Sequence, residues 1–259
     1  MAERKIAPTV DESTFALSYR RIAAEAGLDG EFLTDSLVHT LYGIYACLLE
    51  ASHKFNLTAI TEHTAVAERH LVDSLIPFSM LSQMGLLKDG DALCDIGAGA
   101  GFPSLPAAAA ANDGALPDIT VHSVDSTAKK IGHITDTAKR LSLSNVSGTA
   151  GRAEELARGD MRESFNIVTA RAVSAMPVLI ELAAPFVKVG GIFAAMKAHS
   201  DEEVTAAAKG AEILGFTAAE THEYTLPSGD VRSLVIYRKV KPTPDAYPRQ
   251  YSKITSKPL

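Results

Sequence analysis

CDIGAGAGFPSLP, residues 94–106, places three glycines at alternate positions directly after a short apolar run. Asp95 precedes them, and the glycines are Gly97, Gly99 and Gly101. Glycine adopts turns that a Cβ forbids, and it lets a ligand approach the main chain closely. In an open α/β sheet, ligands bind beyond the carboxyl ends of the strands. The stretch therefore predicts a ligand-binding turn between a strand and a helix.

Downstream of this turn, strand-like runs alternate with helical runs, which is typical of a parallel sheet covered on both faces. Two later runs joined by the turn LPSGD predict an antiparallel hairpin at the edge of the sheet. We therefore expect an α/β fold with a doubly wound sheet and a C-terminal antiparallel hairpin. The expected strands are Ala92–Ile96, Ile119–Val124, Val146–Ala150, Ile167–Ala170, Ile192–Met196, Phe216–Thr225 and Arg232–Lys239, and the expected helices include Ala128–Leu141 and Met176–Val187.

The sequence divides into three expected parts: a helical N-terminal region (1–85), the sheet domain (86–240) and a basic C-terminal tail (241–259). In the first part, a second helix is expected over Thr61–Leu81, with Thr61 as its N-cap. An earlier helix is indicated by apolar residues at helical spacing, namely Leu33, Leu37, Leu41, Ile44 and Leu48. The tail is rich in proline and basic residues, so we expect no regular structure there. It is either a disordered end or a phosphate-binding arm.

The composition limits the classes of protein to which the chain can belong. The chain has 259 residues, 46% of them hydrophobic and 22% charged, which is typical of a globular protein. Neither a bilayer-spanning stretch nor a signal peptide is recognisable, so we expect a cytoplasmic protein without a membrane partner. Cys47 and Cys94 lie in apolar contexts and no cluster has zinc-ligand spacing, so no metal is expected. A net charge of −6 argues against a general nucleic-acid coat, although it permits a local basic face.

The glycine spacing distinguishes between cofactors. NAD sites carry G-x-G-x-x-G, whereas this turn has G-x-G-x-G and Phe102 at the sixth position. The next strand ends in Asp125, a residue placed to accept hydrogen bonds from ribose hydroxyls. Asp95, the glycines and Asp125 together suit S-adenosylmethionine, which has an amino-acid end and a nucleoside end without a pyrophosphate. The alternatives are a tight turn that binds nothing and an Asp125 that only caps a helix.

The sequence resembles the bacterial 16S ribosomal RNA (guanine-N7)-methyltransferase family, also called glucose-inhibited division protein B. The resemblance covers nearly the whole chain from about residue 50, and its order and spacing are specific. It implies a class I methyltransferase (Rossmann-like) fold that acts on 16S ribosomal RNA or the small ribosomal subunit. The stretches that carry it are KFNLTAI, RHLVDSL, CDIGAGAGFPSLP, VDSTAKK, GRAEEL, ARAV and AAMKA.

The resemblance also implies roles for individual residues. Cofactor contacts are implied at Gly97, Phe102, Ala153, Glu154 and Arg171. The RNA or active-site side is implied for Asn56, Lys129, Arg152, Lys197 and Arg232, of which Asn56, Lys197 and Arg232 would position the substrate and Lys129 and Arg152 would bind RNA. The chain departs from the family pattern at Ser104, Ala128 and Ala198, where small residues replace glycine.

The residues are compatible with methylation of guanine N7. This nitrogen has a free lone pair and no proton, so in-line transfer needs alignment but no general base. Neither cysteine is placed for attack on a pyrimidine, and the segment NIVTARAVSA lacks the polar loop usual for exocyclic amines. Two alternatives remain open: a methyltransferase for a small molecule or protein, and a noncatalytic nucleotide-binding protein.

Overall fold

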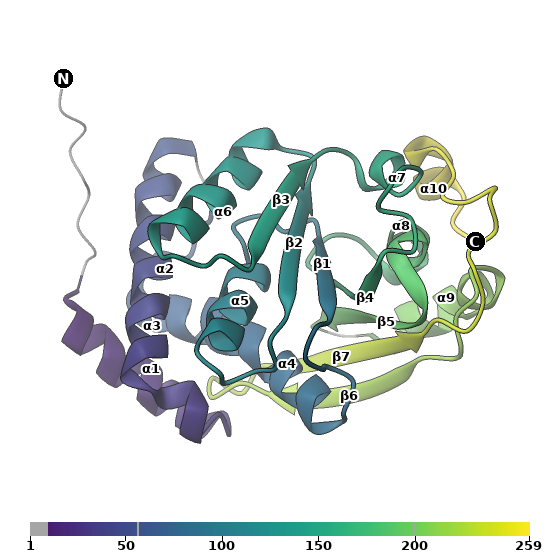
Figure 1. Cartoon of the computed structure of the whole chain (residues 1–259). Coiled ribbons are helices and arrows are strands. Elements are labelled where there is room, and N and C mark those ends of the chain that lie inside the picture. Colours follow the sequence, from purple (N-terminus) through teal and green to yellow (C-terminus); the bar gives the residue numbers. More distant parts are fainter. Residues whose placement is uncertain (1–9, 56, 199) are drawn as a thin grey trace.

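The computed structural model describes residues 10–55, 57–198 and 200–259, so the expected site residue Asn56 lies outside the described residues. One seven-stranded sheet has the order β3-β2-β1-β4-β5-β7-β6 (Figure 1). Strands β1 to β5 pair in parallel, and β7 runs antiparallel to both β5 and β6. The strands are β1 (Ala92–Ile96), β2 (Thr120–Asp125), β3 (Val146–Ala150), β4 (Phe165–Arg171), β5 (Val187–Lys197), β6 (Glu220–Thr225) and β7 (Val231–Arg238).

Helices cover both faces of this sheet. One face carries α1 (Glu12–Glu25), α2 (Asp35–Phe55), α3 (His63–Val66), α4 (Asp73–Gln83), α5 (Ser104–Asn112) and α6 (Ala128–Arg140), with the 3₁₀ helix η1 (Gly30–Leu33) and the π-helical segment η2 (Ala67–Val72). The other face carries α7 (Ala153–Leu156), α8 (Met176–Ala183), η3 (Ala184–Phe186) and α9 (Asp201–Ile213). The last helix, α10 (Tyr251–Ser256), lies beside α7 and α8 (Figure 1).

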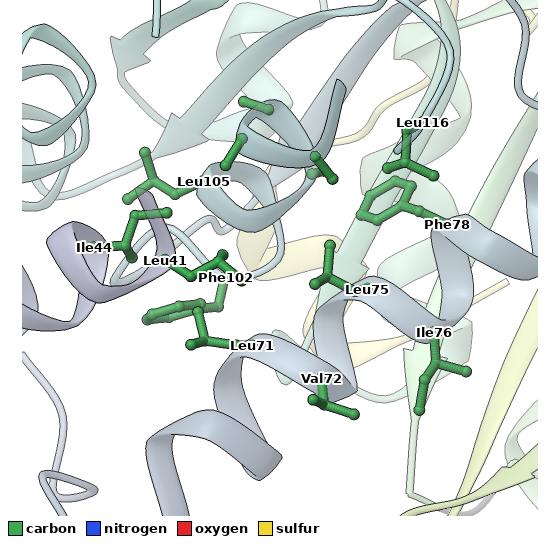
Figure 2. Close-up of a cluster of buried hydrophobic side chains, with 14 of the residues drawn as sticks. Leu41, Ile44, Leu71, Val72, Leu75, Ile76, Phe78, Phe102, Leu105 and Leu116 are labelled. Atoms are coloured by element: carbon green, nitrogen blue, oxygen red, sulfur yellow. The ribbon is translucent and has the colours of Figure 1, made fainter. Parts of the chain in front are cut away.

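The N-terminal helices share one hydrophobic core with the sheet and with α5. Figure 2 shows Leu41 and Ile44 of α2 beside Phe102 and Leu105, with Leu71 and its neighbours on the following helix. Burying such side chains stabilises a fold by about 1.5–3 kcal/mol each. This packing fixes the helices over the glycine turn, so residues near position 70 can contribute to a site built on the sheet.

The predicted strands and the edge hairpin are confirmed. The strand over 146–150 has the expected bounds, and β5 begins five residues earlier than expected, at Val187. Phe216 makes only an isolated bridge to Lys239 and does not belong to β6. The expected N-cap Thr61 is wrong, because the side chain of Glu62 accepts the backbone N–H groups at the start of α3.

The expectation that the tail 241–259 lacks regular structure is also wrong, since it contains α10. Ile254 of α10 is fully buried against α8. Arg249 donates two hydrogen bonds of 2.9 and 2.6 Å to the carboxylate of Glu181, a residue of α8 that is 0% exposed. Glu181 and the α8 residues that contact Ile254 lie far from the tail in the sequence. The composition of the tail alone therefore does not indicate this packing.

Candidate functional site

The glycine turn lies where the expected ligand site should be. After β1 ends, the backbone N–H groups of Gly97 and Ala98 donate to the carbonyl of Val124 at 2.7 and 3.0 Å. Gly97, Gly99 and Gly101 have φ values of +69°, +58° and +89°. These φ values lie in the region that glycine adopts readily and other residues adopt rarely. The backbone conformation alone therefore disfavours a side chain at all three positions.

The three glycines face different surroundings. A Cβ on Gly97 would lie 2.6 Å from a methyl of Val173, and one on Gly101 would lie 2.5 Å from a methyl of Leu105. A Cβ on Gly99 would meet only the carbonyl oxygen of Gly97, at 3.8 Å. Gly101 is thus required for packing of α5, whereas Gly99 borders open space.

A cleft of about 280 Å³ opens beside this turn, and we call it the glycine-loop cleft. Its walls come from the segments that follow β1, β2, β3 and β4, together with the start of α10. It therefore stands at the carboxyl edge of the parallel strands, where α/β sheets bind ligands. The residues that line it include Gly97, Asp125, Arg152, Ala153, Glu154 and Tyr251.

Two buried carboxylates line the glycine-loop cleft, one at the end of β2 (Asp125) and one in the first turn of α7 after β3 (Glu154). Asp125 accepts the backbone N–H groups of Gly99 at 3.0 Å and Thr127 at 2.8 Å. Glu154 accepts the Nε of Arg152 at 3.1 Å. The structure brings Asp125, Ala153 and Glu154, all expected at the cofactor, together in this cleft, and their contact with a cofactor stays a prediction. Carboxylates held in this way can accept hydrogen bonds from hydroxyl groups.

Asp95 lies beneath the turn instead of in the cleft. Its side chain is 1% exposed, and the hydroxyl of Thr169 donates to its Oδ1 over 3.1 Å. Burial raises the pKa of this carboxyl to about 7. Asp95, which we expected at the cofactor, therefore supports the glycine turn from beneath and is not among the residues that line the cleft.

A second cleft of about 660 Å³ adjoins the first, and we call it the arginine cleft. Ala172 lines both clefts, so the segment after β4 forms their common wall. The charged and polar residues of the arginine cleft are Arg69, His70, Asp73, Arg171, Lys197, Glu203, Tyr224 and Arg232.

Asp73 organises the arginine cleft. Its carboxylate accepts Nη1 of Arg171 at 3.2 Å and the hydroxyl of Tyr224 at 3.0 Å, and Nε of Arg232 lies 3.7 Å from it. In a regular helix the carbonyl of Asp73 would accept a hydrogen bond from the backbone N–H of residue 77, but Pro77 has no N–H. The Tyr224 hydroxyl lies 3.4 Å from this carbonyl. Two guanidinium groups from distant strands are therefore held in place by one buried carboxylate.

His70 lines the arginine cleft and stacks on Phe102. Their rings stack with centroids 4.6 Å apart, and Phe102 is buried. Burial, and then the nearby Arg171 guanidinium, lower the pKa of His70 to about 4, so its imidazole is neutral near pH 7. The structure thus places Phe102 and Arg171, both expected at the cofactor, in or beneath the second cleft.

Lys197 extends from the end of β5 into the arginine cleft. Its Nζ lies 2.6 Å from Oε2 of Glu203 and donates to the carbonyl of Ser174 at 2.9 Å. Arg232 also enters this cleft, so two of the three residues expected to position a substrate are brought together, and Asn56 lies outside the described residues. Lys129 lines neither cleft but a hollow between α2 and α6, and its contact with RNA stays a prediction.

Sequence reasoning missed several residues of these clefts, among them Asp73, Tyr224 and Tyr251. Asp73 and Tyr224 are single polar residues on a helix and a strand, and nothing local indicates that they meet. Tyr251 belongs to the tail, which we expected to be irregular. The side chains of the described residues contain no group of three or more His, Cys, Asp and Glu that could hold a metal ion. Among the same residues, no helix is both long and apolar enough to cross a membrane.

Comparison with known proteins identifies a family. The family model for GidB, described as rRNA small subunit methyltransferase G, matches residues 38–231. The ribosomal RNA small subunit methyltransferase G of Streptococcus suis (strain 05ZYH33) is 40% identical over 229 residues, which are 88% of this chain and 93% of that protein. The protein of the same name from Acetivibrio thermocellus is 36% identical over 253 residues, which are 96% of this chain and 100% of that protein.

Solved structures agree on the fold. The CurJ carbon methyltransferase has a TM-score of 0.52 and 12% identity, and the match covers 90% of this chain and 72% of that one. At this identity the likeness concerns the fold alone. Together with the sheet order, it confirms the predicted class I methyltransferase fold.

Proposed function

The chain belongs to the family of the rRNA small subunit methyltransferase G, and from this premise we propose that it methylates N7 of a guanine in 16S ribosomal RNA. The protein is a methyltransferase, and its methyl donor is S-adenosylmethionine. The observation that carries the proposal is the pair of adjoining clefts, one lined by the carboxylates of Asp125 and Glu154 and one by arginines, which meet at Ala172.

The glycine-loop cleft suits the donor. Gly97 exposes main chain at its wall, and the carboxylates of Asp125 and Glu154 can accept hydrogen bonds from the hydroxyl groups of a nucleoside. When bound, S-adenosylmethionine supplies an electrophilic methyl group on a sulfonium sulfur. We therefore assign Gly97, Asp125, Ala153 and Glu154 to the binding of this cofactor.

The arginine cleft suits an acceptor carried by RNA. Arg69, Arg171, Lys197 and Arg232 outnumber the carboxylates of the same wall. Cationic side chains fix the position of a nucleic acid through its phosphates. We propose that Arg232 and Lys197 orient the nucleotide, whereas Arg171 is held by Asp73 and shapes the boundary with the first cleft.

The protonation state of the arginine cleft is compatible with N7 as the acceptor. Guanine N7 presents a free lone pair, so the protein must align the purine and need not remove a proton. His70 is neutral because its pKa is about 4, and it stacks on Phe102. We therefore propose that the residues of this cleft hold and orient the guanine. The proposed reaction needs no general base.

Labelled methyl transfer tests the function. The substrates are 16S rRNA and small subunits from a strain that lacks the modification, and borohydride–aniline cleavage then detects N7-methylguanosine. We expect label in the RNA and cleavage at a guanine. Label found only in a small molecule or a protein would contradict the proposal and favour the other methyltransferase alternative. We place the reaction in the cytoplasm, where bacterial ribosomes are assembled.

A matched pair of variants on β7 tests the role of the arginine cleft. Loss of one hydrogen bond to a charged group costs about 1.5–3 kcal/mol, so Arg232→Ala should lower kcat/KM for the RNA roughly 10- to 150-fold. Arg238 lies near the other end of β7, where it donates to Glu220 at 2.7 Å. Arg238→Ala should leave kcat/KM unchanged. Equal effects of the two variants would refute the assignment.

A further inference from the structure

The C-terminal tail contributes a wall to the glycine-loop cleft. Tyr251, the first residue of α10, lines this cleft together with residues that follow β1 to β4. The matched part of the family model ends at residue 231, so this contribution lies outside it. Figure 1 shows α10 above α8 and next to α7, at the end of the sheet where β3 and β1 finish.

The tail is fixed in this position by a buried ion pair. Glu181 accepts four hydrogen bonds from Arg249, including the backbone N–H at 2.8 Å and Nη2 at 2.6 Å. Arg162 donates to the carbonyls of Tyr247 at 2.9 Å and Thr243 at 2.7 Å. These contacts fix the main chain on the N-terminal side of Tyr251.

An apolar contact fixes the tail on the other side of Tyr251. Ile254 is 0% exposed and forms a small cluster with Val178 and Leu182 of α8. Leu182 also lines the glycine-loop cleft, so α10 and the cleft wall are parts of one packed unit. The position of Tyr251 is therefore fixed by the packing of the tail against α8.

The ring of Tyr251 is supported at the cleft by Arg152. The Arg152 guanidinium carbon lies 4.2 Å from the centroid of the Tyr251 ring, and its Nε donates to Glu154. Tyr251 nevertheless remains 40% exposed. An aromatic ring beside a guanidinium and a carboxylate is a suitable surface for a flat, nitrogen-containing base, since such rings stack favourably.

We propose that Tyr251 contacts the adenine of S-adenosylmethionine, so that the C-terminal tail completes the cofactor site. The inference rests on the assignment of the glycine-loop cleft to this cofactor. The chemistry recognised is a purine base, with Tyr251 as its stacking partner and Arg152 as the residue that holds the tyrosine ring.

Calorimetry with S-adenosylmethionine tests this role. An aromatic stacking contact is worth about 0.5–1.5 kcal/mol, so Tyr251→Ala should raise Kd roughly two- to tenfold. Tyr251→Phe keeps the ring and should bind as the original chain does. Lys253 is exposed on the same helix, and Lys253→Ala should leave Kd unchanged.

Asp125→Asn separates the two assignments. If this variant weakens binding and Tyr251→Ala does not, the role of Tyr251 is overturned and the cleft assignment stands. If neither variant changes Kd, both assignments are wrong. If Asp125→Asn and Tyr251→Ala both raise Kd while Lys253→Ala does not, the proposal is supported.

Fluorescence gives a second measurement that does not depend on a loss of affinity. The chain contains no tryptophan, so Tyr251→Trp introduces a single reporter at the cleft. We expect its emission to change on titration with S-adenosylmethionine, whereas the emission of Lys253→Trp should stay constant. Constant emission from Tyr251→Trp at saturating cofactor would overturn the proposal.

Discussion

Replacing Asp95 with asparagine tests how the glycine turn is supported. Asp95 is buried beneath the turn, where Thr169 donates a hydrogen bond of 3.1 Å to Oδ1. Burial raises its pKa from 3.8 to about 7. Between these two pH values the folded protein therefore retains a proton that the unfolded chain has released. Asparagine has nearly the same shape as the protonated acid and cannot titrate.

The sign of the effect follows from proton binding. Because the unfolded chain binds fewer protons in this window, the free energy of unfolding falls as the pH rises toward 7 and is level above it. Each pH unit between the two pKa values accounts for about 1.4 kcal/mol, so the interval from pH 5 to 7 accounts for roughly 3 kcal/mol. Asp95→Asn should abolish this loss.

Urea unfolding at pH 5 and pH 8.5 measures the difference. We expect Asp95→Asn to gain about 3 kcal/mol relative to the original chain between the two pH values. Other titrating groups are common to both proteins and cancel in the comparison. The exposed Asp160→Asn serves as the control and should follow the original chain at both pH values. If the stability gap between Asp95→Asn and the original chain is the same at pH 5 and pH 8.5, the reasoning is refuted.

Three further substitutions test the packing of the glycine turn and of the tail. Gly101→Ala should destabilise the fold by about 1–3 kcal/mol in urea unfolding, because its Cβ would overlap Leu105. Gly99→Ala, which meets open space, should cost less, and equal losses would contradict the distinction. Glu181→Gln should cost roughly 3 kcal/mol, since Arg249 loses its buried charge partner. An unchanged unfolding midpoint in this variant would contradict the proposed anchoring of the tail.

The sheet could be predicted because its signals are local. Strands β1, β4 and β5 contain short apolar runs, and β1 and β3 have the predicted bounds. The glycine turn and Asp125 were also predictable, since parallel strands bring their carboxyl ends to one edge. The hairpin followed from the turn LPSGD in the same way.

Lys197 and Arg232 were expected on the active-site side from the family resemblance, but the contacts that build the arginine cleft could not be predicted, because they join residues far apart in the sequence. Asp73 and Arg171 are 98 residues apart, and only the packing of α4 beside the sheet brings them together. The tail was misjudged for a similar reason. Its proline and basic residues indicate disorder when taken alone, and the buried carboxylate of Glu181 that orders Arg249 lies on a distant helix.

A crystal structure with S-adenosylmethionine or its demethylated product tests the central claim most directly. The ligand should occupy the glycine-loop cleft, with its ribose hydroxyls at hydrogen-bond distance from Asp125 or Glu154 and its methyl position directed toward Ala172 and the arginine cleft. A ligand bound in the arginine cleft, or anywhere away from the turn at Gly97, would contradict the account.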